Sequence, residues 1–242
     1  MSKVKSENQQ LAASPFAFQI ECEFLTPYGY LSRKLFVRCP RFLAVMKILF
    51  FSDLHGDQVA ISRIADQLPE MDVAFGLGDF ASFGRGLQET IVELDVGVDV
   101  YLLPGNHDDA KELKWICKDH SSFHYFHGEH ISLGSNNFAG LGGGLPGLPF
   151  ALTEEKAKQI LNRFIKIRNL ILCTHTPPYG TRVDVTWSGA HIGYQSLRDF
   201  VIEVQPLAVF SGHVHEVEGT TDYLGNTKLE AIGRQGRIFE IK

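Results

Sequence analysis

The stretch MKILFFSDLHGD, residues 46–57, decides the fold that this sequence predicts. It contains an apolar run, KILFF (47–51), with the length and composition of a buried β-strand. Two polar side chains, Asp53 and His55, follow this run directly. A helical spacing of apolar residues begins a few positions later, over 58–68. A strand, a polar turn and a helix in this order are typical of the first unit of an α/β protein.

Strands and helices keep alternating along the rest of the chain. Further strands are predicted at 72–77, 99–103, 169–173 and 206–210. Further helices are predicted at 87–96, 109–118, 153–167 and 193–204. The segment 122–140 is rich in β-forming residues, and 214–241 alternates like an antiparallel meander with a turn at 224–226. The pattern therefore predicts βαβ units, a largely parallel sheet and an antiparallel C-terminal part.

Residues 1–45 differ from the rest because they show little periodicity and hold no motif. We expect an N-terminal extension at 1–45 and one domain at 46–242. Two interpretations of the extension stay open. It is either a native but peripheral segment, or a stretch upstream of a translation start at Met46, which the pattern slightly favours.

Composition limits the classes of partner. The chain has 242 residues, 44% of them hydrophobic, which is enough for a full core, and a formal net charge of -5 without a basic stripe. We therefore expect no long nucleic acid as partner, whereas nucleotides and short single strands stay open. The apolar run 41–51 is too short for a bilayer, which takes about 20 apolar residues, and it contains Lys47.

The cysteines and the N-terminus predict a cytoplasmic protein. None of the four cysteines forms a C-x-x-C pair or has a zinc-finger spacing, which favours reduced thiols. They are Cys22, Cys39, Cys117 and Cys173. The polar N-terminus is followed by no secretory apolar region. We expect no membrane partner.

Polar residues follow five predicted strands at their carboxyl ends, where open α/β sheets bind ligands. They are Asp53 and His55, Asp79, Asn106 with His107 and Asp108, His175, and His213 with His215. Carboxylate, amide and imidazole groups are the usual ligands of hard and borderline metal ions. Neighbouring glycines allow sharp turns and close backbone approach there. The sequence therefore predicts a metal site at this edge.

The number of these ligands indicates two ions. Seven of the side chains are suited to bind metal: Asp53, His55, Asp79, Asn106, His175, His213 and His215. A single ion takes about four to six ligands, water included. Two ions about 3.5–4 Å apart, with one bridging carboxylate, suit in-line displacement at phosphorus. Because residues i and i+2 of a strand project to one side, we expect Asp53 with His55, and His213 with His215, to reach one ion each.

With these motifs in order, the sequence resembles the calcineurin-like metallophosphoesterase superfamily. The superfamily motifs D-x-H, G-D, G-N-H-[DE], a single H and G-H-x-H begin here at Asp53, Gly78, Gly105, His175 and Gly212. The resemblance covers nearly everything after Met46. It implies an α/β sandwich of four layers, in which two packed mixed β-sheets are flanked by helices.

The resemblance also implies roles for single residues. Asp79 would bridge the two ions. One site would be completed by Asp53, His55 and His215, and the other by Asn106, His175 and His213. A hydroxide between the ions would be the nucleophile, and His107 is the candidate catalytic residue that stabilises the phosphate or protonates the leaving oxygen. Asp108 has two open roles: support of an imidazole, or the N-cap of the helix at 109–118.

Departures from the motifs narrow the subfamily. Protein phosphatases of the superfamily read G-D-x-V-D-R-G where this chain has GDFASFG at 78–84, so a protein serine/threonine phosphatase is disfavoured. The stretches THTPPYG (174–180) and SGHVHEVEG (211–219) look more like the small Icc-related phosphoesterases. The family's N-P-G near the C-terminus is replaced by Ala231-Ile232-Gly233.

Several further features receive no role in catalysis. His120, His124, His127 and His130 fit strand alternation with exposed imidazoles better than a second metal site. The glycine run 142–144 lacks the context of a phosphate-binding loop. Asp184 and His191 either line the site or only shape its loop, and Trp115 is expected in the core. Trp187 is either a core residue or a rim contact, and the apolar loop at 145–150 either forms a homodimer or closes the site.

The sequence thus predicts a metal-dependent phosphoric ester hydrolase with a dinuclear centre. It would act on small phosphodiesters or phosphomonoesters as its partners, with manganese as the first candidate metal and iron, nickel or zinc as the others. A nuclease or nucleotide pyrophosphatase on the same site is the alternative enzyme. The alternative outside enzymes is a non-catalytic metal-binding or interaction module.

Overall fold

The computed structural model describes residues 20–26, 29–35, 45–144 and 150–241 of the 242. The chain forms two units, Met1–Ala44 and Val45–Lys242. In the first unit, β1 (Ile20–Thr26) and β2 (Gly29–Leu35) pair as an antiparallel hairpin. The other residues of this unit, with Cys39 among them, lie outside the described residues. Both interpretations of residues 1–45, a native peripheral segment or a stretch upstream of the translation start, therefore stay predictions.

The second unit contains two mixed sheets. The five-stranded sheet has the order β13-β3-β4-β5-β6. Its strands are β3 (Met46–Phe51), β4 (Val73–Gly76), β5 (Val100–Leu102), β6 (Phe123–Tyr125) and β13 (Arg237–Ile241). The six-stranded sheet has the order β11-β12-β10-β9-β8-β7. Its strands are β7 (His130–Leu133), β8 (Asn136–Leu141), β9 (Leu170–Thr174), β10 (Ala208–Ser211), β11 (Thr221–Leu224) and β12 (Thr227–Ala231).

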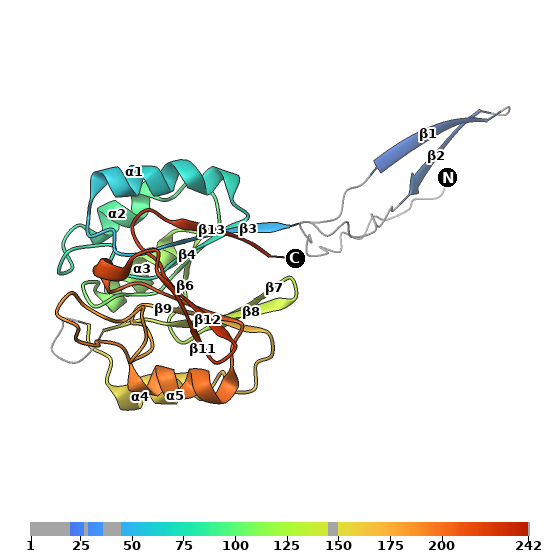
Figure 1. Ribbon diagram of the computed structural model, residues 1–242. Coiled ribbons are helices and arrows are strands. Elements are labelled where there is room, and N and C mark those ends of the chain that lie inside the picture. The colour runs from blue at the N-terminus through green and yellow to red at the C-terminus, as the bar shows by residue number, and fades with distance from the viewer. Residues whose placement is uncertain (1–19, 27–28, 36–44, 145–149, 242) are drawn as a thin grey trace. The chain divides into compact units, whose positions relative to one another are not determined.

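Helices cover the outer faces of both sheets. They are α1 (Gln58–Gln67), α2 (Leu87–Glu93), α3 (Ala110–Asp119), α4 (Glu154–Leu161) and α5 (Gln195–Val204). Two short 3-10 helices, η1 (Leu68–Glu70) and η2 (His215–Val217), follow α1 and β10 along the chain. Helices α1, α2 and α3 pack on the five-stranded sheet, and α4 and α5 pack on the six-stranded sheet. Figure 1 shows α1 on one side of this unit and α4 with α5 on the other. The predicted fold class, two packed mixed sheets flanked by helices, is confirmed.

Successive apolar side chains of β3 face opposite sides of the sheet, and both sides are buried. Leu49 and Phe51 point to the helix-covered side, and Ile48 and Phe50 point into the core between the sheets. In that inner core the rings of Phe50 and Phe210, one from each sheet, lie 4.2 Å apart. A strand buried on both faces has to be apolar along its buried length, which is what ILFF at 48–51 shows, while Lys47 is exposed.

The prediction of an antiparallel meander at 214–241 is wrong in part. The hairpin of β11 and β12 is present, and its turn falls at the predicted place. However, β12 runs parallel to β10, and β13 leaves this sheet to pair antiparallel with β3 of the other. The ring of Phe239 on β13 packs 4.5 Å from Phe210 and 5.5 Å from Phe50. Alternation predicts a strand but not its neighbour, which this packing between the sheets decides.

One end of the fold collects the loops that follow five strands. Backbone hydrogen bonds join these loops: Asp53 N donates to Gly78 O at 2.9 Å, and Gly212 N donates to His175 O at 3.0 Å. Ser52 N donates to the oxygen of Gly233, at 3.2 Å. The segment 231–233, which stands where the family has N-P-G, therefore lies beside the loop that carries Asp53. Among helices within the described ranges, none has both the length and the apolar composition that a membrane crossing requires.

Candidate metal centre

Four of the predicted ligands have a backbone conformation that side chains rarely adopt. Asp53, His55, Asp79 and His213 have φ angles of 58°, 46°, 56° and 73°, in the left-handed region. Such strain persists where surrounding structure holds it, and it concentrates at functional sites. Strand alternation therefore does not govern these loops, and His213 and His215 belong to different groups of candidate ligand atoms. His213 has a positive φ and His215 begins a 3-10 helix, so this pair does not have the extended backbone that the alternation assumes.

Close backbone approach brings the loops together at glycines. A Cβ atom on Gly105 would overlap the Asp79 carboxylate, and one on Gly78, where φ is 98°, would overlap the backbone of Gly105. A Cβ on Gly212 would overlap the hydroxyl of Ser52 and lie 2.6 Å from Asp53 Oδ2. The predicted role of these glycines is confirmed.

The tight packing at Gly212 leads to a prediction. We expect Gly212→Ala to lower the free energy of unfolding by about 1–3 kcal/mol, because the added methyl group pushes Ser52 and Asp53 away from residue 212. Urea unfolding of the metal-free protein measures this. Gly56→Ala is the matched comparison, since a Cβ there meets no atom within 4 Å and only its φ of 72° is unfavourable. Equal losses in the two variants would show that contact with Ser52 and Asp53 does not matter.

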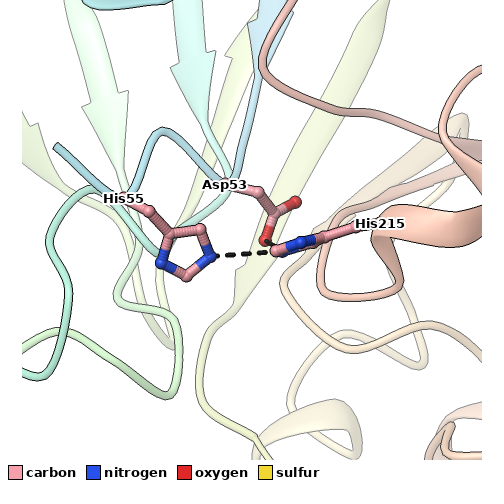
Figure 2. Close-up of side chains that lie close together, drawn as sticks. All are labelled: Asp53, His55 and His215. Atoms are coloured by element: carbon pink, nitrogen blue, oxygen red, sulfur yellow. Dashed lines mark hydrogen bonds and ion pairs between the residues drawn. The ribbon is translucent and has the colours of Figure 1, made fainter. Parts of the chain in front are cut away.

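The first group of ligand atoms comes from Asp53, His55 and His215, as Figure 2 shows. His55 Nε2 lies 3.1 Å from His215 Nε2, and His215 Nε2 lies 3.4 Å from Asp53 Oδ1. Burial lowers the pKa of His55, which favours its neutral form. Two imidazole nitrogens that face each other beside a carboxylate need a proton or a cation between them. The donor set therefore fits a divalent ion.

The second group comes from Asp79, His175 and His213, with the amide of Asn106 beside it. His175 Nδ1 lies 2.8 Å from Leu77 O, so it carries the proton and leaves Nε2 free to bind a metal. That Nε2 atom lies 3.0 Å from Asn106 Oδ1. Burial, together with His175, lowers the pKa of His213 to about 4, so its ring is neutral and can act as a ligand.

Asp79 lies between the two groups. Its Oδ2 atom is 3.6 Å from His55 Nε2 and 3.5 Å from His175 Nε2, while Oδ1 accepts a hydrogen bond of 2.8 Å from His107 N. Although burial alone would lower the pKa of His175, the carboxylates of Asp79 and Asp53 raise it to about 9. The buried pocket thus favours positive charge beside Asp79, which a proton or a metal ion can supply.

His107 lies at the edge of this arrangement. It shares a third group of ligand atoms with His55 and Asp79, and its ring lies 4.8 Å from that of His55. His107 Nδ1 accepts a hydrogen bond of 3.3 Å from Phe83 N. A neutral His107 therefore carries its proton on Nε2, where it can donate to an oxygen of a ligand.

Asp108 has neither of the two roles left open by the sequence. Among the hydrogen bonds of the described residues, none joins Asp108 to an imidazole, and the N-cap of α3 is Asp109, which accepts from Lys111 N and Glu112 N. Instead the buried Asp108 carboxylate accepts four backbone hydrogen bonds: from Asp79, Phe80, Ala81 and Gly105. Burial, with Asp79 nearby, raises its pKa to about 7. Asp108 thus holds the backbone of the loop that carries Asp79.

The histidines between 120 and 130 do not gather into a metal site. Within the described residues, the three groups that could hold an ion all lie at the centre above. His120 pairs with Asp95 and His124 with Asp99, each at 2.8 Å. His127 is not exposed as predicted: its Nδ1 accepts from Gly142 N at 2.9 Å, and burial lowers its pKa to about 4.

The sequence also left open the roles of Asp184, His191, two tryptophans and the apolar loop at 145–150. Asp184 is buried and shapes its own loop, accepting hydrogen bonds from the backbone of Gly180, Thr181 and Gly193 and lying 2.7 Å from His191 Nδ1. The core position expected for Trp115 is wrong, because its side chain is 51% exposed, and Trp187 is also exposed. Residues 145–149 lie outside the described residues, so both roles of that apolar loop stay predictions.

The contacts that the loop after Asp79 makes with His55 and His107 were not predicted from the sequence. Ser82 Oγ donates to His55 O at 3.1 Å, and Gly84 N donates to His107 O at 2.7 Å. The only signal in the sequence was the departure GDFASFG itself, which indicates a different loop without indicating its partners.

Comparison with known proteins shows the family of the chain. A family model described as calcineurin-like phosphoesterase matches residues 46–217. The chain is 30% identical over 194 residues to the uncharacterised protein MJ1162 of Methanocaldococcus jannaschii, covering 75% of this chain and 85% of that one. It is also 30% identical over 175 residues to the probable glycerophosphodiester phosphodiesterase GpdQ of Arcobacter nitrofigilis. That match spans 66% of this chain and 62% of the relative, which is less than two thirds of its length.

Solved structures share the fold. TT1561 of Thermus thermophilus superposes with a TM-score of 0.62 at 19% identity, over 79% of this chain and 91% of that one. A dimetal phosphatase from Danio rerio gives a TM-score of 0.57 at 12% identity, over 78% and 88%. By its motifs, its fold and these matches, the chain belongs to the calcineurin-like phosphoesterase family and is a hydrolase of phosphoric esters.

Proposed function

We propose that the chain hydrolyses small phosphodiesters or phosphomonoesters with two divalent ions bound side by side. The observation that carries this proposal is the position of Asp79, whose Oδ2 atom lies within 3.6 Å of one histidine from each group. The proposed ligands of the two ions are Asp53, His55, Asp79, Asn106, His175, His213 and His215. When bound, the ions would supply positive charge that polarises the phosphate and makes a water molecule more acidic.

The chain's own residues would orient the ester and move a proton. Leu77 O holds the His175 ring in one tautomer, and Asp108 holds the loop of Asp79, so ligand atoms are in place before an ion binds. His107 would donate from Nε2 to the phosphate or to the leaving oxygen. Because Nδ1 already accepts from Phe83 N, no reorientation of the ring is needed for this.

Manganese is the first metal to test. The donor set mixes carboxylate, amide and imidazole groups, which accept Mn, Fe, Ni and Zn. Small phosphate esters are the proposed partners, and the predictions of no long nucleic acid, no membrane partner and a cytoplasmic location stand beside this proposal.

The proposal is tested with metal-stripped protein reloaded with Mn, Fe, Ni or Zn. We expect metal-dependent hydrolysis of bis-p-nitrophenyl phosphate or p-nitrophenyl phosphate, and the ratio of the two rates separates a diesterase from a monoesterase. Two bound ions without turnover of either compound would count against a broad esterase. Protein that binds no ion at all would contradict the proposal.

A prediction concerns His107. We expect His107→Gln to lower kcat on bis-p-nitrophenyl phosphate by about 100-fold because a proton donor is lost. Bound Mn should stay at two ions per chain, since His107 is not among the proposed ligands. His130→Gln is the control, because that side chain is exposed on β7. A His107→Gln variant that loses its metal instead would make His107 a ligand.

A further inference from the structure

Phe83 is an exposed aromatic residue at the rim of the candidate metal centre. Its side chain is 67% exposed, although it follows the buried Phe80 and Ala81. Its ring lies 4.3 Å from the ring of His107 at an interplanar angle of 67°. His107 in turn shares a group of ligand atoms with His55 and Asp79. Only one imidazole therefore separates this ring from the place where ions and phosphate would bind.

The chain holds Phe83 there in an unfavourable conformation. Its φ of 53° lies in the left-handed region, which a bulky residue rarely adopts. Three hydrogen bonds fix the loop: Ser82 Oγ to His55 O at 3.1 Å, Phe83 N to His107 Nδ1 at 3.3 Å, and Gly84 N to His107 O at 2.7 Å. An exposed ring in a left-handed conformation gains little for folding, so the arrangement points to a role in binding.

We propose that the Phe83 ring binds a planar aromatic group of the ester beside His107. This inference rests on the proposed function, and it narrows the substrate class to esters of aryl alcohols or of compounds with a similar flat ring. An aromatic face attracts such a ring through offset or edge contacts and through apolar burial. An aliphatic ester would lack these contacts and gain nothing from Phe83.

The variants are chosen so that the loop keeps its shape. Phe83→Asn removes the ring, and asparagine tolerates the left-handed region, so the backbone N–H to His107 is retained. Phe83→Tyr keeps a ring. Tyr223→Asn is the control: Tyr223 is exposed and pairs with Lys228 at the start of β12, at the end of the sheet away from the site.

The test is the binding of phenylphosphonate and methylphosphonate to the Mn-loaded protein, measured by calorimetry. Neither compound has an ester bond, so the result does not depend on turnover, and failure of the proposed function would appear separately as absent ester hydrolysis. We expect the unchanged protein, Phe83→Tyr and Tyr223→Asn to prefer phenylphosphonate. In Phe83→Asn this preference should fall by about 3- to 10-fold. An unchanged preference in Phe83→Asn, an equal loss of affinity for both compounds, or no preference in the unchanged protein would overturn the proposal.

Discussion

Asp79→Asn is expected to reduce phosphoesterase turnover by roughly 10³-fold or more and to weaken the binding of both ions. Asp79 Oδ2 lies within 3.6 Å of His55 Nε2 and 3.5 Å of His175 Nε2, so removing its charge affects both ligand groups. Asparagine keeps the size of the side chain and an oxygen that can accept from His107 N, which limits the change in the fold. Turnover of bis-p-nitrophenyl phosphate and bound Mn are measured on the same samples.

The control for this variant is Asp119→Asn, an exposed carboxylate at the end of α3. It changes the net charge by the same amount and should leave turnover within about twofold, since exposed charges far from a site act weakly. If Asp79→Asn kept both its ions and its turnover, a bridging role for Asp79 would be excluded.

Asp108→Asn is expected to lower the free energy of unfolding by about 2–4 kcal/mol. In the protein, one carboxylate oxygen accepts from Asp79 N and Gly105 N, and the other accepts from Phe80 N and Ala81 N. Asparagine replaces one of these oxygens with an NH₂ group, which leaves two buried N–H donors without an acceptor at about 1–3 kcal/mol each. Urea unfolding of metal-free protein separates this loss from any effect of bound ions.

The adjacent Asp109→Asn is the matched control. Asp109 caps α3 with one oxygen, and asparagine caps a helix about as well, so its unfolding free energy should change by less than about 0.5 kcal/mol. Similar values for the two variants would show that the four hydrogen bonds of Asp108 contribute little.

The candidate metal-binding residues could be predicted because each follows an apolar run that is recognisable as a buried strand. Parallel β3 and β4 bring Asp53 and Asp79 to one edge of the five-stranded sheet, whereas His175 follows β9 of the other sheet and reaches Asp79 because the two sheets pack together. The packing of two sheets came from the resemblance, since apolar runs do not say how many sheets they form. The pairing of β13 with β3 was not predicted either, because an alternating pattern does not show which sheet a strand joins.

The role of Asp108 and the separation of His213 from His215 could not be read from local patterns. The partners of Asp108 include backbone groups 27 to 29 residues away, whereas a capping argument considers only the next turn of the chain. The separation of the two histidines depends on the φ of 73° at His213, which a residue type does not reveal. Phe83 escaped notice because an apolar residue in a loop gives no sign of the imidazole that it contacts.

The number of manganese ions bound per chain tests the central claim most directly. Equilibrium dialysis of metal-stripped protein against Mn, with quantification by mass spectrometry, gives this number for the unchanged protein and for Asp79→Asn. We predict two ions for the unchanged protein, as expected of a centre in which one carboxylate serves both sites. We predict fewer than two for the variant at the same free concentration. A single ion or none in the unchanged protein, over the range of Mn that supports any hydrolysis, would contradict the account.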